Sequence, residues 1–248
     1  MRSLKKMVEK VVARYPPLYA LGSKAYHAIN RSFKPGNPGA PAGVSRALRY
    51  AAEKRGRDIG DYYEFGIFKG YTYWWAQKVC GELGLEGPNF YAFDSFKGLP
   101  ELEDIDKVIG DGIFFKGQFS CSRKQVTRFL EKNGVDWTRT HLIEGFYEDS
   151  LTEELREKYP FKRVAVALLD CDLHTSTIES MRWLAPYLEG GSIVLFDDWR
   201  AFSEESGAGQ RSALKQFLSE IPSLSFEPLF EYEVHGQAFV VRKGRNDR

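Results

Sequence analysis

Two short acidic stretches stand out because each directly follows a mostly apolar run. Asp170-Cys171-Asp172 follows residues 163–169, and Asp197-Asp198 follows residues 191–196. If both runs are neighbouring parallel strands, about 4.8 Å apart, their carboxylates converge at one rim of a sheet. Converging carboxylates repel one another, and a cation that prefers oxygen ligands relieves that repulsion. We therefore predict a site for Mg²⁺, or a similar divalent cation, at Asp170, Asp197 and Asp198.

The same stretches have plainer interpretations, as helix caps, solvated turns or ion-pair partners of Arg200 and Arg211. The first stretch nevertheless holds three groups able to accept a proton, Asp170, Asp172 and His174. A base beside a bound cation is suited to taking the proton of a hydroxyl group. These three residues are the candidate catalytic residues.

A second set of residues suits a nucleoside ligand. The glycine turn of residues 64–70 follows one predicted strand and allows a ligand to approach the backbone. Asp94 ends the next strand, where a carboxylate can accept both ribose hydroxyls. Phe146 or Tyr147 can stack on a base. The alternatives are an ordinary turn, a strand-end cap and two core aromatics. The candidate binding residues are Glu64, Gly66, Gly70, Thr72, Asp94, Ser95, Gly145, Phe146, Tyr147 and Asp170.

The elements that must position these residues follow a β/α rhythm. Strands are predicted at residues 61–65, 89–94, 140–144, 163–170 and 191–197. Helical patterns separate or follow them at residues 71–84, 124–133, 152–159, 176–188 and 212–221. The last two of the five strand runs are apolar on both faces, which is typical of a parallel sheet covered on both sides. We expect an α/β, Rossmann-like, doubly wound sheet.

The end of the chain departs from this rhythm. Residues 224–232 and 237–242 are strand-like, and only residues 233–236 separate them. So short a link excludes a crossover helix and predicts an antiparallel β-hairpin. Five parallel strands followed by a C-terminal hairpin are the layout of the class I methyltransferase fold, and they argue against a nicotinamide dehydrogenase. In that fold the ligand is S-adenosylmethionine, and Glu64 is suited to bind its methionine amino group.

Charge divides the chain unevenly. Residues 1–50 carry ten Lys and Arg against one Glu, a charge of +9, whereas the remainder carries −8 within a total of +1. We interpret residues 1–50 as a basic helical arm with a Pro/Gly linker, and residues 51–248 as the methyltransferase domain. The arm either contacts a membrane surface or another polyanion, or packs on the chain's own acidic body or a neighbouring subunit. A net acidic body argues against nucleic acid as a partner.

Cysteine usage and hydropathy indicate the setting of the protein. The three cysteines, Cys80, Cys121 and Cys171, have no metal-binding or disulfide-framework spacing. No apolar run approaches the roughly 20 residues of a membrane span, and no signal peptide is evident. We expect a cytoplasmic, bacterial enzyme that forms a homo-oligomer.

Several strings between Asp61 and Arg242 resemble the macrocin O-methyltransferases of antibiotic sugar tailoring. They include Phe93-Asp-Ser-Phe-Lys-Gly-Leu-Pro100, residues 117–122, residues 169–177 and Phe196-Asp-Asp-Trp199. The resemblance implies a Mg²⁺-dependent enzyme in which Asp170, Asp197 and Asp198 match the metal ligands. It also implies Asp94 on the ribose and Asp170 as a base. His174 departs from the family, which usually has Tyr there, and the N-terminal 50 residues do not match.

The leading hypothesis is therefore O-methylation of a sugar, a glycan or a glycosylated natural product, assisted by a divalent metal. Residues 100–117 and the N-terminal arm are expected to shape the acceptor pocket, and Gln210-Arg211 to reach a substrate carboxylate or phosphate or else to lie on the surface. One alternative is a metal-independent small-molecule N- or O-methyltransferase. Another is a non-catalytic S-adenosylmethionine-binding scaffold.

Overall fold

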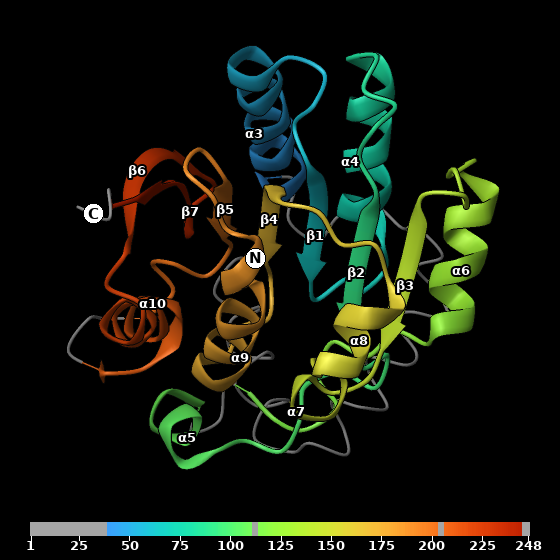
Figure 1. Ribbon diagram of the computed structural model, residues 1–248. Helices are drawn as coiled ribbons and strands as arrows, with labels where there is room; N and C mark the ends of the chain where they lie inside the picture. The colour runs from blue at the N-terminus through green and yellow to red at the C-terminus, as the bar shows by residue number, and fades with distance from the viewer. Residues whose placement is uncertain (1–38, 111–113, 203–205, 245–248) are drawn as a thin grey trace, which may run out of the picture.

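A seven-stranded sheet forms the centre of the computed structural model, which describes residues 39–110, 114–202 and 206–244 (Figure 1). The strand order is β3-β2-β1-β4-β5-β7-β6. The first five of these strands are parallel, whereas β7 is antiparallel to both β5 and β6. The predicted doubly wound sheet with a C-terminal hairpin is thus confirmed. The strands are β1 (Asp61–Phe65), β2 (Phe90–Asp94), β3 (Thr140–Glu144), β4 (Val164–Leu169), β5 (Ile193–Phe196), β6 (Leu224–Tyr232) and β7 (Gly236–Lys243).

Helices cover both faces of the sheet because its strands alternate apolar side chains between two buried layers (Figure 1). In β1, Tyr62 packs with one core cluster and Tyr63 with the other. The first cluster lies under α3 (Gly39–Arg55), α4 (Tyr71–Glu82) and α6 (Arg123–Lys132). The second lies under α8 (Glu153–Lys158), α9 (His174–Leu184) and α10 (Gly209–Glu220).

The beginning of α3 differs from the prediction. The Pro/Gly linker predicted within residues 1–50 is partly helical: α3 starts at Gly39 and includes Pro41 in its first turn, where proline needs no backbone hydrogen-bond donor. Val44 and Leu48 of this helix are fully buried in the core. The predicted domain boundary after residue 50 therefore falls inside α3. Residues 1–38, the main part of the predicted arm, lie outside the described residues.

Local sequence signals account for several helix starts. Ser122 caps α6: its hydroxyl accepts a hydrogen bond from the Gln125 backbone, and the Gln125 side chain accepts one from the Ser122 backbone. Thr152 caps α8 in the simpler way, through its side chain alone. Two short helices were not predicted, α5 (Asp104–Gly110) and α7 (Tyr147–Ser150), and the helix α9 ends in the 3-10 turn η1 (Ala185–Tyr187). No helix in the described ranges has the length and apolar character to span a membrane.

Candidate functional site

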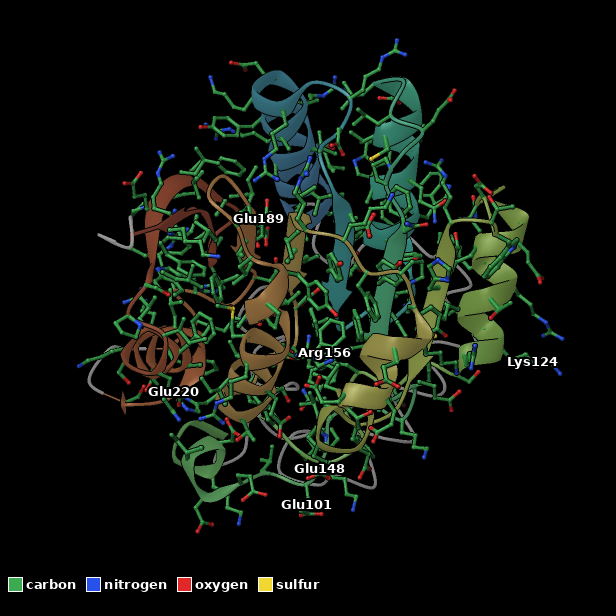
Figure 2. The ribbon with its side chains drawn as sticks, viewed as in Figure 1. Glu101, Lys124, Glu148, Arg156, Glu189 and Glu220 are labelled. Atoms are coloured by element: carbon green, nitrogen blue, oxygen red, sulfur yellow. The ribbon has the colours of Figure 1, made fainter. Side chains whose placement is uncertain are left out.

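One pocket lies at the carboxyl ends of the parallel strands, at the end of the molecule marked by Glu101 and Glu148 and away from Glu189 (Figure 2). Its volume is about 390 Å³, within the usual range for small-molecule sites. Most of the predicted site residues line it. They are Glu64, Gly66, Thr72, Asp94, Ser95, Gly145, Phe146, Tyr147, Asp170, Asp172, Asp197 and Asp198.

The glycine turn after β1 passes close to the loop after β4. Gly66 has φ of 87°, and a Cβ atom there would lie 1.9 Å from the carbonyl oxygen of Asp170. Only glycine fits this position, because both the left-handed backbone and the lack of space exclude a side chain. Gly70, with φ of 82°, ends the turn as the N-cap of α4 and does not itself line the pocket. The glycine turn therefore packs directly against the loop after β4, and both segments line the pocket.

Asp94 is bound mainly by backbone groups. One carboxylate oxygen accepts hydrogen bonds from the amides of Ile67 (2.8 Å) and Phe68 (3.2 Å), and the other accepts one from Phe96 (2.6 Å). Burial raises the pKa of Asp94, and these three donors partly oppose the shift. Asp94 thus ties β2 to the glycine turn at the pocket wall. Ser95 lines the pocket as well, but its hydroxyl donates to the carbonyl of Gly98 (2.8 Å).

Glu64 is almost fully buried at the carboxyl end of β1, and its carboxylate accepts a hydrogen bond from the Tyr62 hydroxyl (2.6 Å). Burial raises the pKa of Glu64 from its usual 4.5 to about 8; Tyr62 opposes the shift, whereas Asp94 and Asp197 add to it. A carboxyl group held in such a place gains from a positively charged ligand. The side chain faces the pocket in which the cofactor was expected.

The raised pKa of Glu64 predicts a pH-dependent stability. The folded protein binds this proton more tightly than the unfolded chain, so stability is lost as pH rises from about 4.5 to about 8. We expect Glu64→Gln to raise Tm at pH 8.5, on the order of 5 °C, and to change it little at pH 4. Differential scanning calorimetry across this range measures the difference. Glu86→Gln is the control, because Glu86 is exposed, and it should change Tm little at any pH. If the Tm difference between Glu64→Gln and the unmodified protein were the same at every pH, the prediction would be contradicted.

The predicted base-stacking aromatics follow β3. Tyr147 packs edge-on against Phe65, with ring centroids 5.7 Å apart, and its hydroxyl donates to the carbonyl of Phe93 at 3.3 Å. Tyr147 is thus partly a core residue, as one interpretation held, although it also lines the pocket. Phe146 lines the pocket beside it, with the Lys97 ammonium 5.9 Å from its ring centre. Both rings remain candidates for contact with a base.

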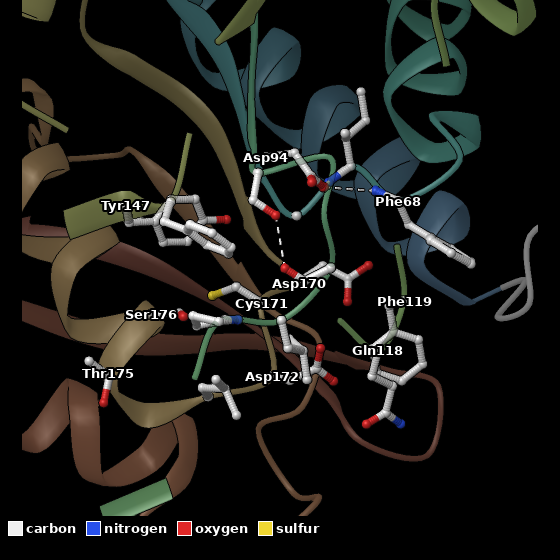
Figure 3. Close-up of a pocket in the computed structure, with 18 of the residues that line it drawn as sticks. Phe68, Asp94, Gln118, Phe119, Tyr147, Asp170, Cys171, Asp172, Thr175 and Ser176 are labelled. Carbon is white, nitrogen blue, oxygen red and sulfur yellow. Dashed lines mark hydrogen bonds between the residues drawn. The ribbon is translucent and has the colours of Figure 1, made fainter. Parts of the chain in front are cut away.

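The aspartates after β4 and β5 meet because the two strands end in register. Leu169 and Phe196, the last residues of β4 and β5, pair with each other, and Asp170 and Asp197 are the residues that directly follow them. The amide of Asp197 donates to the carbonyl of Leu169 at 3.1 Å. All four aspartates of the two stretches line the same pocket. The structure therefore brings the three predicted metal-binding residues to one wall, where Figure 3 shows Asp170 and Asp172.

These carboxylates repel one another. Burial, followed by repulsion from Asp197 and Asp198, raises the pKa of Asp170 well above its usual range. The same causes raise the pKa of Asp172, and burial raises that of Asp198 to about 6. Oxygen donors of this kind are chemically suited to Mg²⁺. Within the described ranges, however, no three His, Cys, Asp or Glu side chains are arranged as a group that could hold a metal ion.

Two expectations about neighbouring residues need correction. Gln210 reaches no substrate: it is buried, accepts a hydrogen bond from the Asp198 amide (2.9 Å) and donates one to the Leu169 carbonyl (2.9 Å). It therefore braces the ends of β4 and β5, while Arg211 donates to the carbonyl of Trp199 (2.7 Å). A glutamine within a polar stretch of sequence gives no sign of such burial.

His174 is not among the residues that line the pocket. It begins α9, is buried, and its Nε2 lies 3.1 Å from the side-chain oxygen of Gln216 in α10. The first turn of α9 directs the ring toward α10, so this structure gives no support to the expected role of His174 as a base, which stays a prediction. The candidate bases that line the pocket are Asp170 and Asp172.

Sequence reasoning missed Asp106. This buried residue of α5 accepts hydrogen bonds from the backbone amide of His174 (2.7 Å) and the hydroxyl of Thr175 (2.6 Å). It thus caps α9 from a distant segment and attaches α5 to the loop that carries Asp170 and Asp172. The predicted role of residues 100–117 in shaping the pocket remains a prediction, but this contact gives it a physical basis. An aspartate amid other acidic residues offers no local signal for such a contact.

Relatives with known roles share part of this chain. A protein of Streptomyces olivaceus, 8-demethyl-8-(2,3-dimethoxy-alpha-L-rhamnosyl)-tetracenomycin-C 4'-O-methyltransferase, is 27% identical over 143 residues, covering 56% of this chain and 53% of that protein. Mycinamicin III 3''-O-methyltransferase of Micromonospora griseorubida is 24% identical over 160 residues, covering 61% of both. The similarity thus spans between about half and three-fifths of these relatives.

Solved structures share the fold. The O-methyltransferase NovP superimposes with a TM-score of 0.68 at 17% identity, covering 83% of this chain and 79% of that one. The calicheamicin methyltransferase CalS11 does so with a TM-score of 0.63 at 22% identity, covering 80% and 78%. Both establish the class I methyltransferase architecture. The model of the macrocin O-methyltransferase (TylF) family matches residues 48–220, from α3 to α10 and through all the strand ends that form the pocket, so this chain belongs to that family.

Proposed function

We propose that this protein transfers the methyl group of S-adenosylmethionine to a hydroxyl of a sugar, or of a glycosylated natural product, with the help of a divalent cation. The observation that carries the proposal is the meeting of a glycine turn, a buried carboxylate and four aspartates in one pocket at the carboxyl ends of the strands. Two of the relatives are named as O-methyltransferases of glycosylated natural products, which supports a sugar hydroxyl as the acceptor.

The pocket residues suit a sulfonium nucleoside. Glu64 offers a buried carboxylate to the methionine amino group, and the glycine turn at Gly66 lines the pocket beside it. Asp94 retains unused acceptor capacity for the ribose, since a carboxylate can accept more hydrogen bonds than the three it has. Phe146 and Tyr147 offer a surface for the adenine. The positive sulfonium group would also be attracted by the acidic wall of the pocket.

Proton transfer falls to the aspartates. The sulfonium methyl is already activated, so the acceptor hydroxyl is the partner that needs help. Asp172 is the best-placed base that is not itself a proposed metal ligand, and its burial makes its carboxylate more basic than that of an exposed aspartate. Its backbone has φ of 58°, a strained conformation of the kind found at functional sites. Within the described residues Asp170, Asp197 and Asp198 are not arranged as a metal-binding group, so a cation would have to draw them together; held there, it would supply Lewis acidity toward the hydroxyl.

Methyl transfer from radiolabelled S-adenosylmethionine tests this proposal. The acceptors would be nucleotide sugars and glycosides, each assayed after EDTA treatment and after readdition of Mg²⁺. We expect turnover of at least one sugar, a rate loss of roughly a hundredfold or more with EDTA, and recovery with Mg²⁺. Full activity in EDTA would remove the metal and favour the metal-independent alternative. Binding of S-adenosylhomocysteine without turnover of any acceptor would favour the scaffold.

A further inference from the structure

Two phenylalanines of the pocket have unusual backbones. Phe68, in the glycine turn, has φ of 45°, and Phe119, in the loop before α6, has φ of 59°. Left-handed backbone is unfavourable for any residue with a Cβ atom and for a bulky ring in particular. Both residues nevertheless line the pocket, and their ring centroids lie 6.2 Å apart at an interplanar angle of 79°. Strain kept at a pocket wall indicates a use for the side chains it presents.

The pair is held in place by backbone contacts. The amide of Phe68 donates to Asp94 at 3.2 Å. The segment leading to Phe119 is bound to the loop after β2: the amide of Leu99 donates to the Gln118 carbonyl (2.9 Å), and the amide of Gly117 donates to the Leu99 carbonyl (2.9 Å). The two rings thus come from two loops that are both attached to the end of β2. The resulting aromatic wall is fixed by the fold rather than by its own packing.

Phe119 remains 40% exposed, which is unusual for a large apolar side chain in the described part of the chain. A ligand that covers this ring would therefore bury apolar surface that the fold leaves exposed. Figure 3 shows Phe68 and Phe119 on one side of the Asp170 segment and Tyr147 on the other. The surfaces proposed for the adenine and the ribose, at Phe146 to Tyr147 and at Asp94, leave this aromatic pair for the second substrate.

We infer that Phe68 and Phe119 form the acceptor platform: the C–H face of a sugar ring lies on the aromatic pair while its hydroxyls point toward the aspartates. A pyranose has both kinds of surface, and the pocket offers both, an apolar wall and an acidic wall. The inference rests on the proposed function and adds the residues that orient the acceptor. It also predicts selectivity, since a hydroxyl in place of hydrogen on the stacked face would lose aromatic contact.

The acceptor platform is tested by measuring the methyl-transfer kinetics of the variant Phe119→Ala, using the sugar from the acceptor panel that turns over fastest. We expect KM for the sugar to rise roughly five- to twentyfold, with the affinity for S-adenosylhomocysteine unchanged by calorimetry. Phe119→Tyr, which keeps a flat ring, should restore most of the affinity. Trp137→Ala is the matched control, because Trp137 is 41% exposed and does not line the pocket. It should leave both constants unchanged.

Saturation-transfer NMR on the S-adenosylhomocysteine-bound protein completes the test, with the same sugar or, if none turns over, methyl rhamnoside and methyl glucoside. The platform predicts transfer concentrated on one C–H face of the ring and lost in Phe119→Ala. An unchanged sugar KM in that variant, or equal losses of sugar and cofactor affinity, would overturn the platform alone. No turnover of any sugar together with no sugar binding would overturn both the platform and the proposed function.

Discussion

Replacing Asp170 by Asn is expected to lower kcat/KM by roughly a thousandfold while leaving the protein folded. Asp170 follows β4 at the centre of the pocket, and its carboxylate interacts with those of Asp197, Asp198 and Asp172. The amide keeps the shape of the side chain but removes its charge, so it weakens cation binding and proton acceptance together. Initial rates of methyl transfer at saturating Mg²⁺ measure the loss.

The same substitution should raise Tm in the absence of metal. Burial and the neighbouring carboxylates disfavour the charged form of Asp170, and the variant cannot carry that charge. Asp104→Asn is the control, because Asp104 is exposed in α5 and pairs with surface Lys107 (2.9 Å); it should change neither activity nor Tm. An Asp170→Asn protein with near-normal kcat/KM, or one with lower Tm, would show that Asp170 is not a repelled, reactive carboxylate.

Replacing Gly66 by Ala is expected to destabilise the protein by roughly 2 to 5 kcal/mol and to weaken S-adenosylhomocysteine binding more than tenfold. The new Cβ would lie 1.9 Å from the Asp170 carbonyl, so either the glycine turn or the loop after β4 must move. Both of these segments line the pocket, and a shift in either therefore disturbs the ligand as well as the fold. Urea unfolding and calorimetric titration measure the two effects.

The variant Gly84→Ala is the control that separates the two costs expected at Gly66, the steric clash with the Asp170 carbonyl and the strain of a left-handed alanine. Gly84 is also left-handed, with φ of 65°, but a Cβ atom there meets nothing within 4 Å. This control should cost only about 1 kcal/mol, the strain of a left-handed alanine, and leave ligand binding intact. If the two variants are equally stable, the close approach at Gly66 contributes nothing and its left-handed backbone alone explains the glycine.

Much of the architecture follows from local patterns. The runs that became β4 and β5 are apolar on both faces, and only a parallel sheet covered by helices buries such strands. The short link between the last two strands predicted a hairpin, because no crossover helix fits in it. Since the carboxyl ends of parallel strands lie at the same edge of the sheet, the residues that follow them were expected to line one pocket. The start of α3 was missed because proline and glycine in a first helical turn resemble a loop.

Local sequence patterns did not predict the direction of individual side chains or the contacts between residues far apart in the chain. His174 lies four residues beyond Asp170 but faces α10, whereas Asp106, far away in sequence, caps the helix that His174 begins. Gln210 was expected either to reach a substrate or to lie on the surface, but it is buried and braces the ends of two strands. Each outcome depends on which elements become neighbours, and that depends on packing across the whole chain.

The sequence by itself determined the order along the chain of the strands and of the longer helices between them, the position of the glycine turn and the presence of acidic residues after β4 and β5. Hydrophobic periodicity and turn chemistry are local properties, so they can be interpreted without a partner. The tertiary structure alone decided how strongly the aspartates repel, that Glu64 is held at a pKa of about 8, and that Phe119 stands beside Phe68. Burial and proximity exist only after segments distant in the chain have packed together.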